Sequence, residues 1–288
     1  MVNKQDRTVI ITGGASGIGK SLAFRFGSQG ANIVVGDIEH VALNNTVSEL
    51  VSEGISAIGI PVDVSDIDSV RSFRDEVISE FTPPYIVCLN AGVGAGGSII
   101  DSDILDWEWV LGVNLWGVIH GLNVFMPILD KSDEGHIVIT SSIAGHLSYP
   151  NMGAYNASKH AVLTIAETLH YELLEKGSRI GVSVLCPGLV RTNILDSDRN
   201  RPETLTSSIA LDRSDEDDMR KQIVREIYDL ALEPDKVADL VFDAVDSKQF
   251  YIFTEDTFRD AIINRHRNIE SRTNPVLAAN LVEEHLND

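Results

Sequence analysis

Short runs of consecutive apolar residues alternate along this chain with longer segments in which apolar residues recur every three or four positions. The short runs predict β-strands, and the longer segments predict helices. Because the strand runs are apolar at nearly every position, both faces of their sheet should be covered by helices, which is typical of parallel sheets. The pattern therefore predicts an α/β fold built on one doubly wound parallel sheet. The predicted strands are Thr8–Thr12, Asn32–Gly36, Ala57–Pro61, Tyr85–Leu89, His136–Ser141, Gly181–Cys186 and Gln249–Phe253.

Two segments depart from this alternation of strand and helix. Residues 193–232 follow a strand end and predict a helical lid inserted over the edge of the sheet. Residues 255–288 predict a helical C-terminal tail. The chain has 288 residues, of which 43% are hydrophobic, and no repeat or low-complexity tract divides it. We therefore predict a single domain over residues 1–288.

The charge of the chain limits the classes of partner that it can bind. There are 43 acidic and 23 basic side chains, and the formal net charge is −20. Such a chain repels nucleic-acid backbones and anionic lipids, so we expect no nucleic acid and no membrane as partners. Both cysteines, Cys88 and Cys186, lie in predicted strands, which is typical of buried thiols in a reducing compartment. With a polar start and no apolar stretch near the roughly 20 residues that span a bilayer, a cytoplasmic location is expected.

A glycine-rich turn separates the first strand from a helical run over Lys20–Phe26. Its glycines, Gly13, Gly17 and Gly19, are expected to adopt positive φ. They would let backbone amides approach a pyrophosphate at the positive end of the helix dipole. The spacing differs from the usual dinucleotide fingerprint, and a plain tight turn is the alternative.

Asp37 ends the second predicted strand. A carboxylate at this place can accept hydrogen bonds from both hydroxyls of an adenosine ribose, and it repels a 2′-phosphate. The residue therefore favours NAD over NADP as the cofactor. The alternative interpretation is an N-cap of the helix that follows, because aspartate is a preferred cap.

A phenol and an ammonium, those of Tyr155 and Lys159, lie four residues apart in the predicted helix Gly153–Lys176, which puts them on one helix face. A nearby positive charge stabilises a tyrosinate, and lowering the phenol pKa from about 10 toward 7 requires roughly 4 kcal/mol. A phenol poised in this way can exchange a proton with a substrate oxygen while nicotinamide exchanges a hydride with the carbon. Alone, such a pair is more often a surface pair, so its interpretation depends on further motifs.

Further motifs are present, and over about residues 7–253 the sequence resembles the short-chain dehydrogenase/reductase family. The resemblance implies a Rossmann-type fold and a dinucleotide-dependent oxidoreductase. It also implies a homodimer or homotetramer built on the helices Trp107–Leu129 and Ser158–Lys176. The motifs that carry it, in family order, are TGGASGIG at Thr12–Gly19, Asp63 after the third strand, NAG at Asn90–Gly92, Asn114 in VNLWG, the serines 141 and 142, YNASK at 155–159, and PGLVRT at Pro187–Thr192.

The resemblance implies a role for each matching residue. Tyr155 is expected as the general acid/base, and Lys159 is expected to lower its pKa and to hold the nicotinamide ribose. Ser142 would orient the substrate oxygen, and Asn114 would anchor a proton-relay water. Ser142 is preferred over Ser141 because the family's serine lies thirteen residues before its tyrosine, as Ser142 does here. Neighbours on a strand also point to opposite faces, so only one of the two serines can enter the site.

Cofactor contacts follow from the resemblance in the same way. Asp63 and Val64 would contact adenine. Asn90 would line the cofactor site, and Thr192 would bind the carboxamide. The full expected cofactor-binding set is Gly13, Ser16, Gly17, Ile18, Gly19, Asp37, Ile38, Asp63, Val64, Asn90, Ala91, Gly92, Tyr155, Lys159, Pro187, Gly188, Val190 and Thr192.

Three of the assigned residues have simpler interpretations. Ser142 can merely turn the chain after a strand, and Asn114 can be a buried hydrogen-bonding residue. Asp63 can form an N-cap or an Asx turn before the helix Ser65–Phe81. The eight histidines show no ligand spacing, so no metal is predicted. The acidic run Asp212–Asp218 is predicted to be a solvated face.

These features predict an NAD-dependent oxidoreductase that interconverts a secondary alcohol and a ketone. Apolar residues follow Ser142 and recur in the lid, so we expect a bulky, mostly apolar small-molecule substrate. A carboxylate-bearing substrate is the alternative, because Arg191, Arg199 and Arg201 lie in or beside the lid. The apolar lid residues are Ile194, Leu195, Leu205, Ile209 and Leu211.

Other activities have less support. Epimerases and dehydratases of this fold are normally longer chains. A protein that senses a dinucleotide without turnover would be expected to lack Tyr155 or Lys159, and both are present. A reductase of acyl-carrier substrates must dock an acidic protein and usually takes NADPH, which the net charge of −20 and Asp37 oppose.

Overall fold

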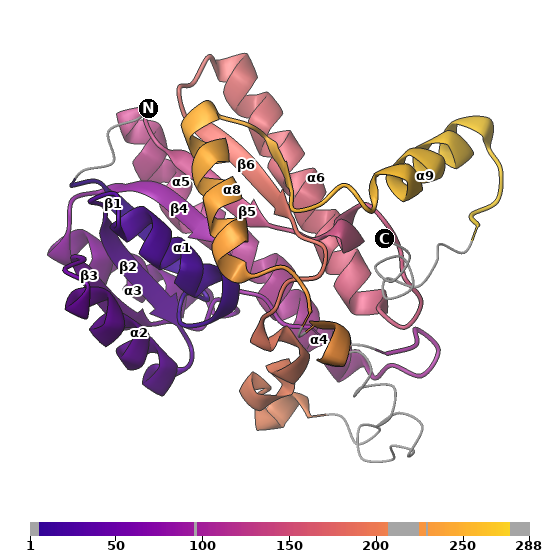
Figure 1. The fold of residues 1–288 in the computed structure, drawn as a ribbon, viewed down its shortest axis with the longest axis horizontal. Helices are drawn as coiled ribbons and strands as arrows, with labels where there is room; N and C mark the ends of the chain where they lie inside the picture. The colour runs from indigo at the N-terminus through magenta and orange to yellow at the C-terminus, as the bar shows by residue number, and fades with distance from the viewer. Residues whose placement is uncertain (1–5, 95–96, 207–224, 229, 277–288) are drawn as a thin grey trace.

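The computed structural model describes residues 6–94, 97–206, 225–228 and 230–276. Seven parallel strands form one sheet in the order β3-β2-β1-β4-β5-β6-β7 (Figure 1), which is the predicted Rossmann-like α/β fold. All the predicted strands are present, and their ends differ from the prediction by at most two residues. The strands are β1 (Thr8–Thr12), β2 (Asn32–Asp37), β3 (Ala57–Pro61), β4 (Pro84–Leu89), β5 (His136–Thr140), β6 (Gly181–Cys186) and β7 (Tyr251–Phe253).

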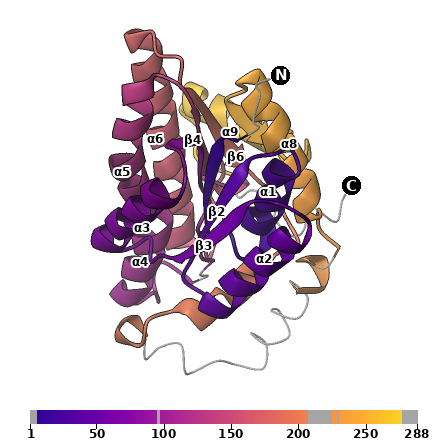
Figure 2. The ribbon, with the colours of Figure 1, turned by 90° about the vertical axis from the view of Figure 1, so that its left-hand side faces the viewer.

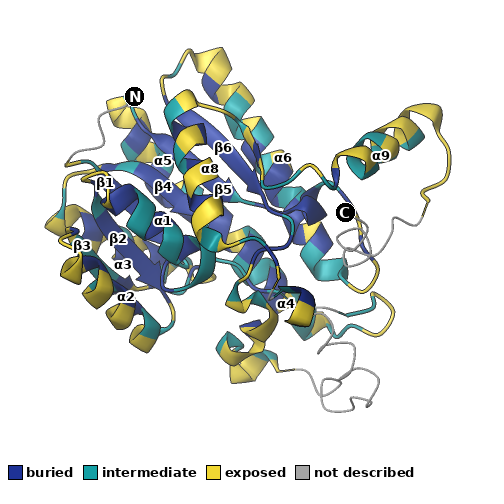
Figure 3. Ribbon diagram, in the orientation of Figure 1, coloured by how far each residue is buried: buried dark blue, intermediate teal, exposed yellow. Residues whose placement is uncertain are grey.

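Helices cover both faces of the sheet (Figure 2). Successive side chains of β1 serve the two faces, because Val9 and Ile11 belong to one core cluster and Ile10 belongs to the other. The strands are therefore buried on both sides, while the outer helix faces are exposed (Figure 3). One layer contains α1 (Gly17–Gly27), α2 (His40–Ser52) and α8 (Pro234–Ser247), and the other contains α3 (Ile67–Glu80), α5 (Gly117–Ser132) and α6 (Gly153–Lys176).

The strand order reverses between β1 and β4, and this reversal places the site. From β1 the chain builds outward to β3, and then it returns to β4 on the other side of β1. The connections leaving β1 and β4 therefore diverge to opposite faces, and a crevice opens at the carboxyl ends of these strands. The predicted motifs follow strand ends, so the fold gathers them at this one edge.

One long helix departs from the sequence expectation. The helices α4 (Ile104–Leu111), η1 (Gly112–Trp116) and α5 form a continuous stretch, Ile104–Ser132, of 29 residues that is apolar enough by length and composition to cross a membrane. The expectation that the chain has no such stretch was therefore wrong, because single polar residues such as Asn114 interrupt the run without lowering its mean hydropathy enough. The buried side chains of α5, among them Phe125 and Leu129, pack in the core against the sheet. This packing is that of the core helix of a globular fold.

The predicted lid and tail are described in part. After β6, residues 193–205 form the short helices η3 (Asn193–Asn200) and η4 (Glu203–Leu205), and residues 225–228 are helical. The predicted lid residues Ile209 and Leu211 and the acidic run at 212–218 lie outside the described residues. In the tail, α9 (Arg259–Ser271) extends away from the body (Figure 1) and has no buried residue.

Candidate functional site

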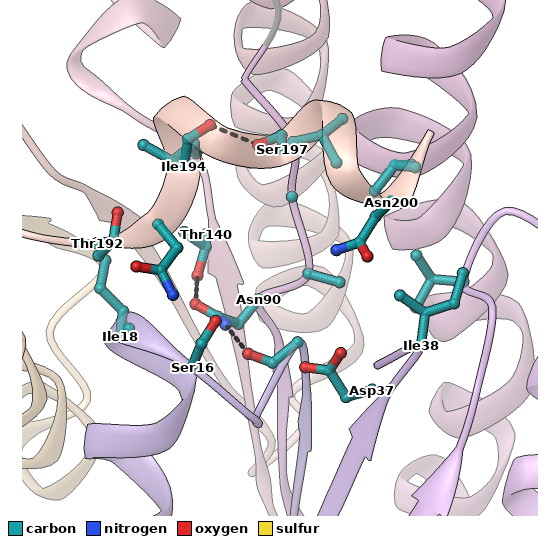
Figure 4. A pocket seen from close by; sticks show the side chains of 18 of the residues that line it. Ser16, Ile18, Asp37, Ile38, Asn90, Thr140, Thr192, Ile194, Ser197 and Asn200 are labelled. Atoms are coloured by element: carbon teal, nitrogen blue, oxygen red, sulfur yellow. Dashed lines mark hydrogen bonds between the residues drawn. The ribbon is translucent and has the colours of Figure 1, made fainter. Parts of the chain in front are cut away.

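A cleft opens at the carboxyl ends of the strands (Figure 4). Its place at the strand-order reversal is typical of a ligand site in this kind of sheet. Most of the predicted site residues line it. They are Gly13, Ser16, Gly17, Ile18, Asp37, Ile38, Asp63, Val64, Asn90, Ala91, Gly92, Tyr155, Lys159, Pro187 and Thr192.

The glycine turn between β1 and α1 requires glycine for two different reasons. Gly13 and Gly17 have φ of +63° and +49°, as predicted. Gly19 does not have positive φ, which corrects the prediction, because it already lies inside α1. A Cβ atom at Gly19 would lie 2.1 Å from the carbonyl oxygen of Gly13, so this glycine permits the first turn of α1 to pack closely on the loop.

Asn90 ties three strand ends together beneath the cleft. Its amide nitrogen donates to the carbonyl oxygens of Thr12 and Gly13, at 3.2 Å each. Its amide oxygen accepts from the hydroxyl of Thr140 at 3.1 Å (Figure 4). These bonds join β1, β4 and β5, so Asn90 both lines the cleft and holds the glycine turn in place.

Asp37 lines the cleft beside the glycine turn. Its carboxylate accepts the backbone N–H groups of Ala15 at 2.9 Å and Glu39 at 3.0 Å. The N-cap position of α2 is Glu39 and not Asp37, so the capping interpretation of Asp37 is not what the structure shows. Burial raises the pKa of Asp37, and the backbone N–H groups counteract this rise. A carboxylate offers about four acceptor positions, so the two oxygens retain capacity for further donors.

Asp63 also lines the cleft, and it forms a local turn. Its Oδ1 accepts from the backbone N–H of Ser65 at 2.9 Å and from the Ser65 hydroxyl at 2.6 Å. The N-cap of α3 is Asp66, whose side chain accepts from the backbone N–H of Asp68. Of the alternatives for Asp63, the Asx turn is therefore present and the N-cap is absent. The turn fixes the carboxylate at the mouth of the cleft without excluding a ligand contact.

Tyr155 and Lys159 both line the cleft; of the two adjacent serines, Ser141 lines it and Ser142 does not. Tyr155 and Lys159 come from the first turns of α6, where Lys159 is buried and Tyr155 is half-buried. Ser142 lies close enough to the Tyr155 phenol to act on its pKa. The neighbouring Ser141 hydroxyl instead donates to the Lys159 carbonyl oxygen at 2.8 Å, so the two serines diverge as strand geometry requires. The Lys159 ammonium lies 5.5 Å from the centre of the Tyr155 ring and donates to the Thr140 carbonyl at 3.1 Å.

Burial is the largest cause of the pKa shifts of Tyr155 and Lys159. It lowers the pKa of Lys159 from 10.5 to about 8. It raises the pKa of Tyr155, while the hydrogen bond from Ser142 acts in the opposite direction. The expectation that Lys159, together with a bound oxidised nicotinamide, lowers the pKa of Tyr155 stays a prediction. The ammonium lies beside the ring and bonds to a backbone carbonyl, so desolvation of the phenolate prevails.

Asn114 lies in the π-helical segment η1 and is buried behind the cleft. Its Oδ1 accepts from the Val93 backbone N–H at 2.8 Å. Its Nδ2 donates to the Val93 carbonyl at 3.0 Å and to the Ser158 hydroxyl at 3.2 Å. Both amide hydrogens are thus used within the protein, as the simpler interpretation of Asn114 expects. The side chain pins the loop after β4 to α6, and its role as a water anchor stays a prediction.

Three residues of the predicted cofactor set do not line the cleft: Gly19, Gly188 and Val190. Val190 is buried in the core. Gly188 donates its N–H to the Thr254 hydroxyl at 3.0 Å, and a Cβ at Gly188 would collide with Glu255. Both residues therefore shape the loop after β6, while Pro187 and Thr192 from the same motif face the cleft.

The first part of the predicted lid forms one side of the cleft. The segment 193–200 crosses it from above, with Ile194, Ser197 and Asn200 facing Asp37 and Asn90 (Figure 4). The lid was predicted as a segment, and none of its residues was assigned to the cofactor, whereas Glu39 could have been suspected from its place two residues after Asp37. The lining residues that were not predicted as cofactor contacts are Glu39, Val62, Val93, Trp109, Val113, Thr140, Ser141, Asn193, Ile194, Ser197, Arg199 and Asn200.

The arginines that suggested a carboxylate-bearing substrate are engaged in ion pairs. Arg199 pairs with Glu39 at 2.6 Å and Arg191 pairs with Glu233 at 2.5 Å. Arg201 pairs with Asp106 at 2.6 Å, and its guanidinium lies 5.0 Å from the centre of the Trp109 ring. A substrate carboxylate would have to displace a resident carboxylate at each of them. This observation weakens the alternative.

The surroundings of Tyr155 on the substrate side are apolar. A cluster around the loop after β5 includes Ile143, Leu147 and Tyr149, and Tyr155 packs against it. The tail contributes to this cluster through the buried Phe258, which no motif predicted. Among the residues that the structure describes, no group of three or more His, Cys, Asp or Glu side chains could hold a metal ion.

Comparison with known proteins adds to this geometry. A family model described as short chain dehydrogenase matches residues 7–203. The chain is 35% identical over 264 residues to the C alpha-dehydrogenase of Sphingobium sp. (strain NBRC 103272 / SYK-6), which covers 91% of this chain and 85% of that protein. It is 33% identical over 256 residues to the 1-deoxy-11-beta-hydroxypentalenate dehydrogenase of Streptomyces avermitilis, covering 87% of this chain and 85% of that one.

A solved structure is similar over nearly the whole length. It is a short chain dehydrogenase/reductase from Burkholderia phymatum in complex with NAD. The TM-score is 0.91 at 38% sequence identity, and the match covers 96% of this chain and 98% of that chain.

Proposed function

The chain belongs to the short-chain dehydrogenase/reductase family, and from this premise we propose that it transfers a hydride between NAD and a secondary alcohol or its ketone, with Tyr155 as the general acid/base. The observation that carries the proposal is that Tyr155 and Lys159 line the same cleft as Asp37. A proton-transfer group and a carboxylate that can bind a ribose thus share one site.

The residues that line the cleft fit a dinucleotide. A side chain at Gly13 would place its Cβ 2.7 Å from the Ala91 backbone, so the turn is kept bare where the N-terminus of α1 offers free N–H groups to a phosphate. Asp37 would accept the hydroxyls of the adenosine ribose. When bound, the nicotinamide supplies or accepts the hydride at the reacting carbon. The relative from Burkholderia phymatum was solved with NAD, which supports the same choice here.

The chain's own groups divide the remaining work. Ser142 holds the substrate oxygen by a hydrogen bond. Its hydroxyl lies near the Tyr155 phenol. In the oxidation direction the Tyr155 oxygen accepts the proton of the substrate hydroxyl, and in the reduction direction it returns that proton. Lys159 has a pKa of about 8 and is therefore mostly positive at neutral pH, so it stabilises the tyrosinate that forms.

We propose a bulky, mostly apolar substrate, because the packing around Tyr155 is apolar. Ile143, Leu147 and Phe258 are nearly fully buried in the apolar cluster against which Tyr155 packs. Tyr228, near the end of the predicted lid, packs against a second apolar cluster, and burial raises the pKa of its phenol. Apolar area gains about 25 cal/mol per Å² on burial, whereas a polyol would leave its hydroxyl groups without partners.

A panel of secondary alcohols and ketones tests the proposal, read by nicotinamide absorbance with NAD(H) and NADP(H). Aryl and cyclic secondary alcohols are expected to turn over faster than sugar alcohols and hydroxy acids. Faster turnover of polyols or hydroxy acids would show that the pocket assignment is wrong. No nicotinamide absorbance change with any member of the panel would count against the proposed substrate class.

The cofactor preference gives a separate prediction. NAD is expected to be used at least about tenfold more efficiently than NADP, because a buried carboxylate facing a phosphate costs more than about 1.4 kcal/mol. Asp37→Asn removes the charge and keeps an acceptor for the N–H of Ala15 or Glu39. It should therefore lower the ratio of kcat/KM with NAD to kcat/KM with NADP. Asp63→Asn, at the same cleft but away from the ribose, serves as the matched control. An unchanged ratio in Asp37→Asn would place the 2′-phosphate elsewhere.

We further propose a homodimer or homotetramer in the cytoplasm, formed by one domain per chain. Exposed apolar side chains on the two helices that the family resemblance singles out support the oligomer: Trp116 before α5, and Tyr171 and Leu174 on α6. Light scattering of the purified protein measures the mass. A monomer at micromolar concentration would contradict the proposal.

A further inference from the structure

The segment η3 spans the cleft from one wall to the other (Figure 4). In its middle, the Ser197 hydroxyl accepts the backbone N–H of Gly94 at 3.0 Å, which fixes η3 to the loop after β4. Beyond its end, Arg201 pairs with Asp106 of α4 at 2.6 Å. These two attachments hold the side of η3 that lies toward α4. The opposite attachment is made by one carboxylate.

That carboxylate is Glu39, in the loop between β2 and α2. Arg199 donates to it from Nε at 3.1 Å and from Nη2 at 2.6 Å. Asn200 adds a third hydrogen bond, from Nδ2 to the same Glu39 oxygen at 2.9 Å. The bond from Arg199 is the largest cause of the lowered pKa of Glu39. Glu39 therefore stays ionised across neutral pH and holds both residues of η3 at once.

The same guanidinium also shapes η3 from inside. Nη1 of Arg199 donates to the carbonyl oxygens of Asn193 at 3.1 Å and Asp196 at 2.9 Å. Asp196 is the residue at which η3 leaves helical geometry, with φ of −104° and ψ of 22°. Arg199 thus bonds to backbone carbonyls at the kink. The same side chain shapes η3 from inside and attaches it to Glu39.

The position of this contact relates it to the cofactor. Glu39 follows Asp37 by two residues, and Glu39, Arg199 and Asn200 all line the cleft together with Ile38 and Asp63. On the proposed function, this is the half of the cleft that takes the adenosine of the dinucleotide. An occupant of that half would lie beneath η3, between Asp37 and the bonds from Arg199 and Asn200 to Glu39.

We propose that Glu39, Arg199 and Asn200 form a latch that closes η3 over the adenosine half of the bound dinucleotide and so limits how fast the cofactor leaves. The inference rests on the proposed function, because it requires a dinucleotide in the cleft. Release then needs the latch to open, while hydride transfer at the far end of the cleft does not. The side chains of Arg199 and Glu39 are 35% and 29% exposed, so salt reaches the pair and weakens it.

Release of NADH, followed by its fluorescence after rapid mixing with excess NAD, tests the latch. Glu39→Gln is expected to speed release about three- to tenfold, the range that a half-exposed bidentate ion pair can supply. In the unaltered protein, raising NaCl from about 0.1 M to about 1 M should speed release as well, and Glu39→Gln should lose most of this salt dependence. Asp239→Asn, which breaks the Arg25–Asp239 pair of 2.7 Å outside the cleft, is the matched control.

The double variant Glu39→Gln with Arg199→Gln separates a latch from a general loss of structure. If the two residues act through their mutual bond, their effects on release will be clearly less than additive. Release from Glu39→Gln at the rate of the unaltered protein would overturn the latch. If NADH does not bind to the unaltered protein at all, the proposed function fails, and this outcome is distinct from unaltered release by the variant.

Discussion

Replacing Tyr155 with phenylalanine is expected to lower kcat by about 10³-fold while the Kd for NAD changes by no more than a few fold. The ring remains, so the packing of Tyr155 against the apolar cluster of the loop after β5 is kept. Only the phenolic hydroxyl is lost. Without it, no group at this place can accept the proton of the substrate hydroxyl. Steady-state rates and NAD titration by fluorescence quenching measure the two quantities.

A matched variant separates chemistry from packing in this experiment. Tyr171 lies on the same helix as Tyr155 but is 59% exposed and far from the cleft, so Tyr171→Phe should leave kcat unchanged. Ser142→Ala should give a smaller loss than Tyr155→Phe, since it removes the partner that orients the substrate oxygen and leaves the acid/base group. Substantial activity in Tyr155→Phe would contradict the assignment of the phenol as the acid/base.

The sheet could be predicted from sequence because strands that are buried on both faces consist mostly of consecutive apolar residues. The runs at β1 and β6 are buried at every position and mostly apolar, and they are bounded by polar or turn residues, so their ends were predicted without error. The run before β7 was predicted too long, from Gln249. There the N–H of Gln249 bonds to the Ala244 carbonyl at the end of α8, an arrangement that apolarity does not reveal.

The floor of the cleft could be predicted residue by residue, whereas its roof could be predicted only as a lid over residues 193–232. Gly13, Asp37 and Asn90 lie at strand ends, where the order of elements alone brings them to one edge. Arg199 meets Glu39 across 160 residues of sequence, through a short kinked helix whose course no periodicity indicates. The conformation of Gly19 was predicted incorrectly for a related reason: spacing shows that a glycine is needed, but not whether φ or close packing requires it.

The pKa values of Tyr155 and Lys159 depend on burial, which spacing does not reveal. Helical spacing put the two residues on one face of α6, which suggests mutual stabilisation of their charged forms. Spacing carries no information on depth. Lys159 is buried and Tyr155 is half-buried, so desolvation shifts each pKa toward the neutral form, and the lysine donates to the Thr140 carbonyl. The proposed mechanism needs Lys159 in its positively charged form, and burial in the protein makes that form less favourable.

The cost of burying a charged lysine leads to the second large effect. Lys159→Met should stabilise the fold while it abolishes activity. The loss of kcat/KM is expected to exceed about 100-fold, because the tyrosinate loses the positive charge beside it. For stability, the fall of the lysine pKa from 10.5 to about 8 corresponds to roughly 3 kcal/mol against the charged form. Methionine removes this penalty but leaves the Thr140 carbonyl without its donor, at about 1 kcal/mol. The net gain in the free energy of unfolding at pH 7 is therefore about 2 kcal/mol.

The dependence of this gain on pH identifies its cause. The lysine pKa is lower in the folded than in the unfolded chain, so the folded state binds fewer protons between pH 8 and 10.5 and loses stability as pH falls through that window. The advantage of Lys159→Met over the unaltered protein should be full below pH 8 and should shrink as pH rises toward 10.5. Urea unfolding of both proteins at several pH values measures this difference. Lys176→Met, an exposed lysine on the same helix, should show no such gain. If Lys159→Met is less stable than the unaltered protein at pH 7, the buried ammonium is held by more than the Thr140 carbonyl, and the cost derived from its pKa is wrong.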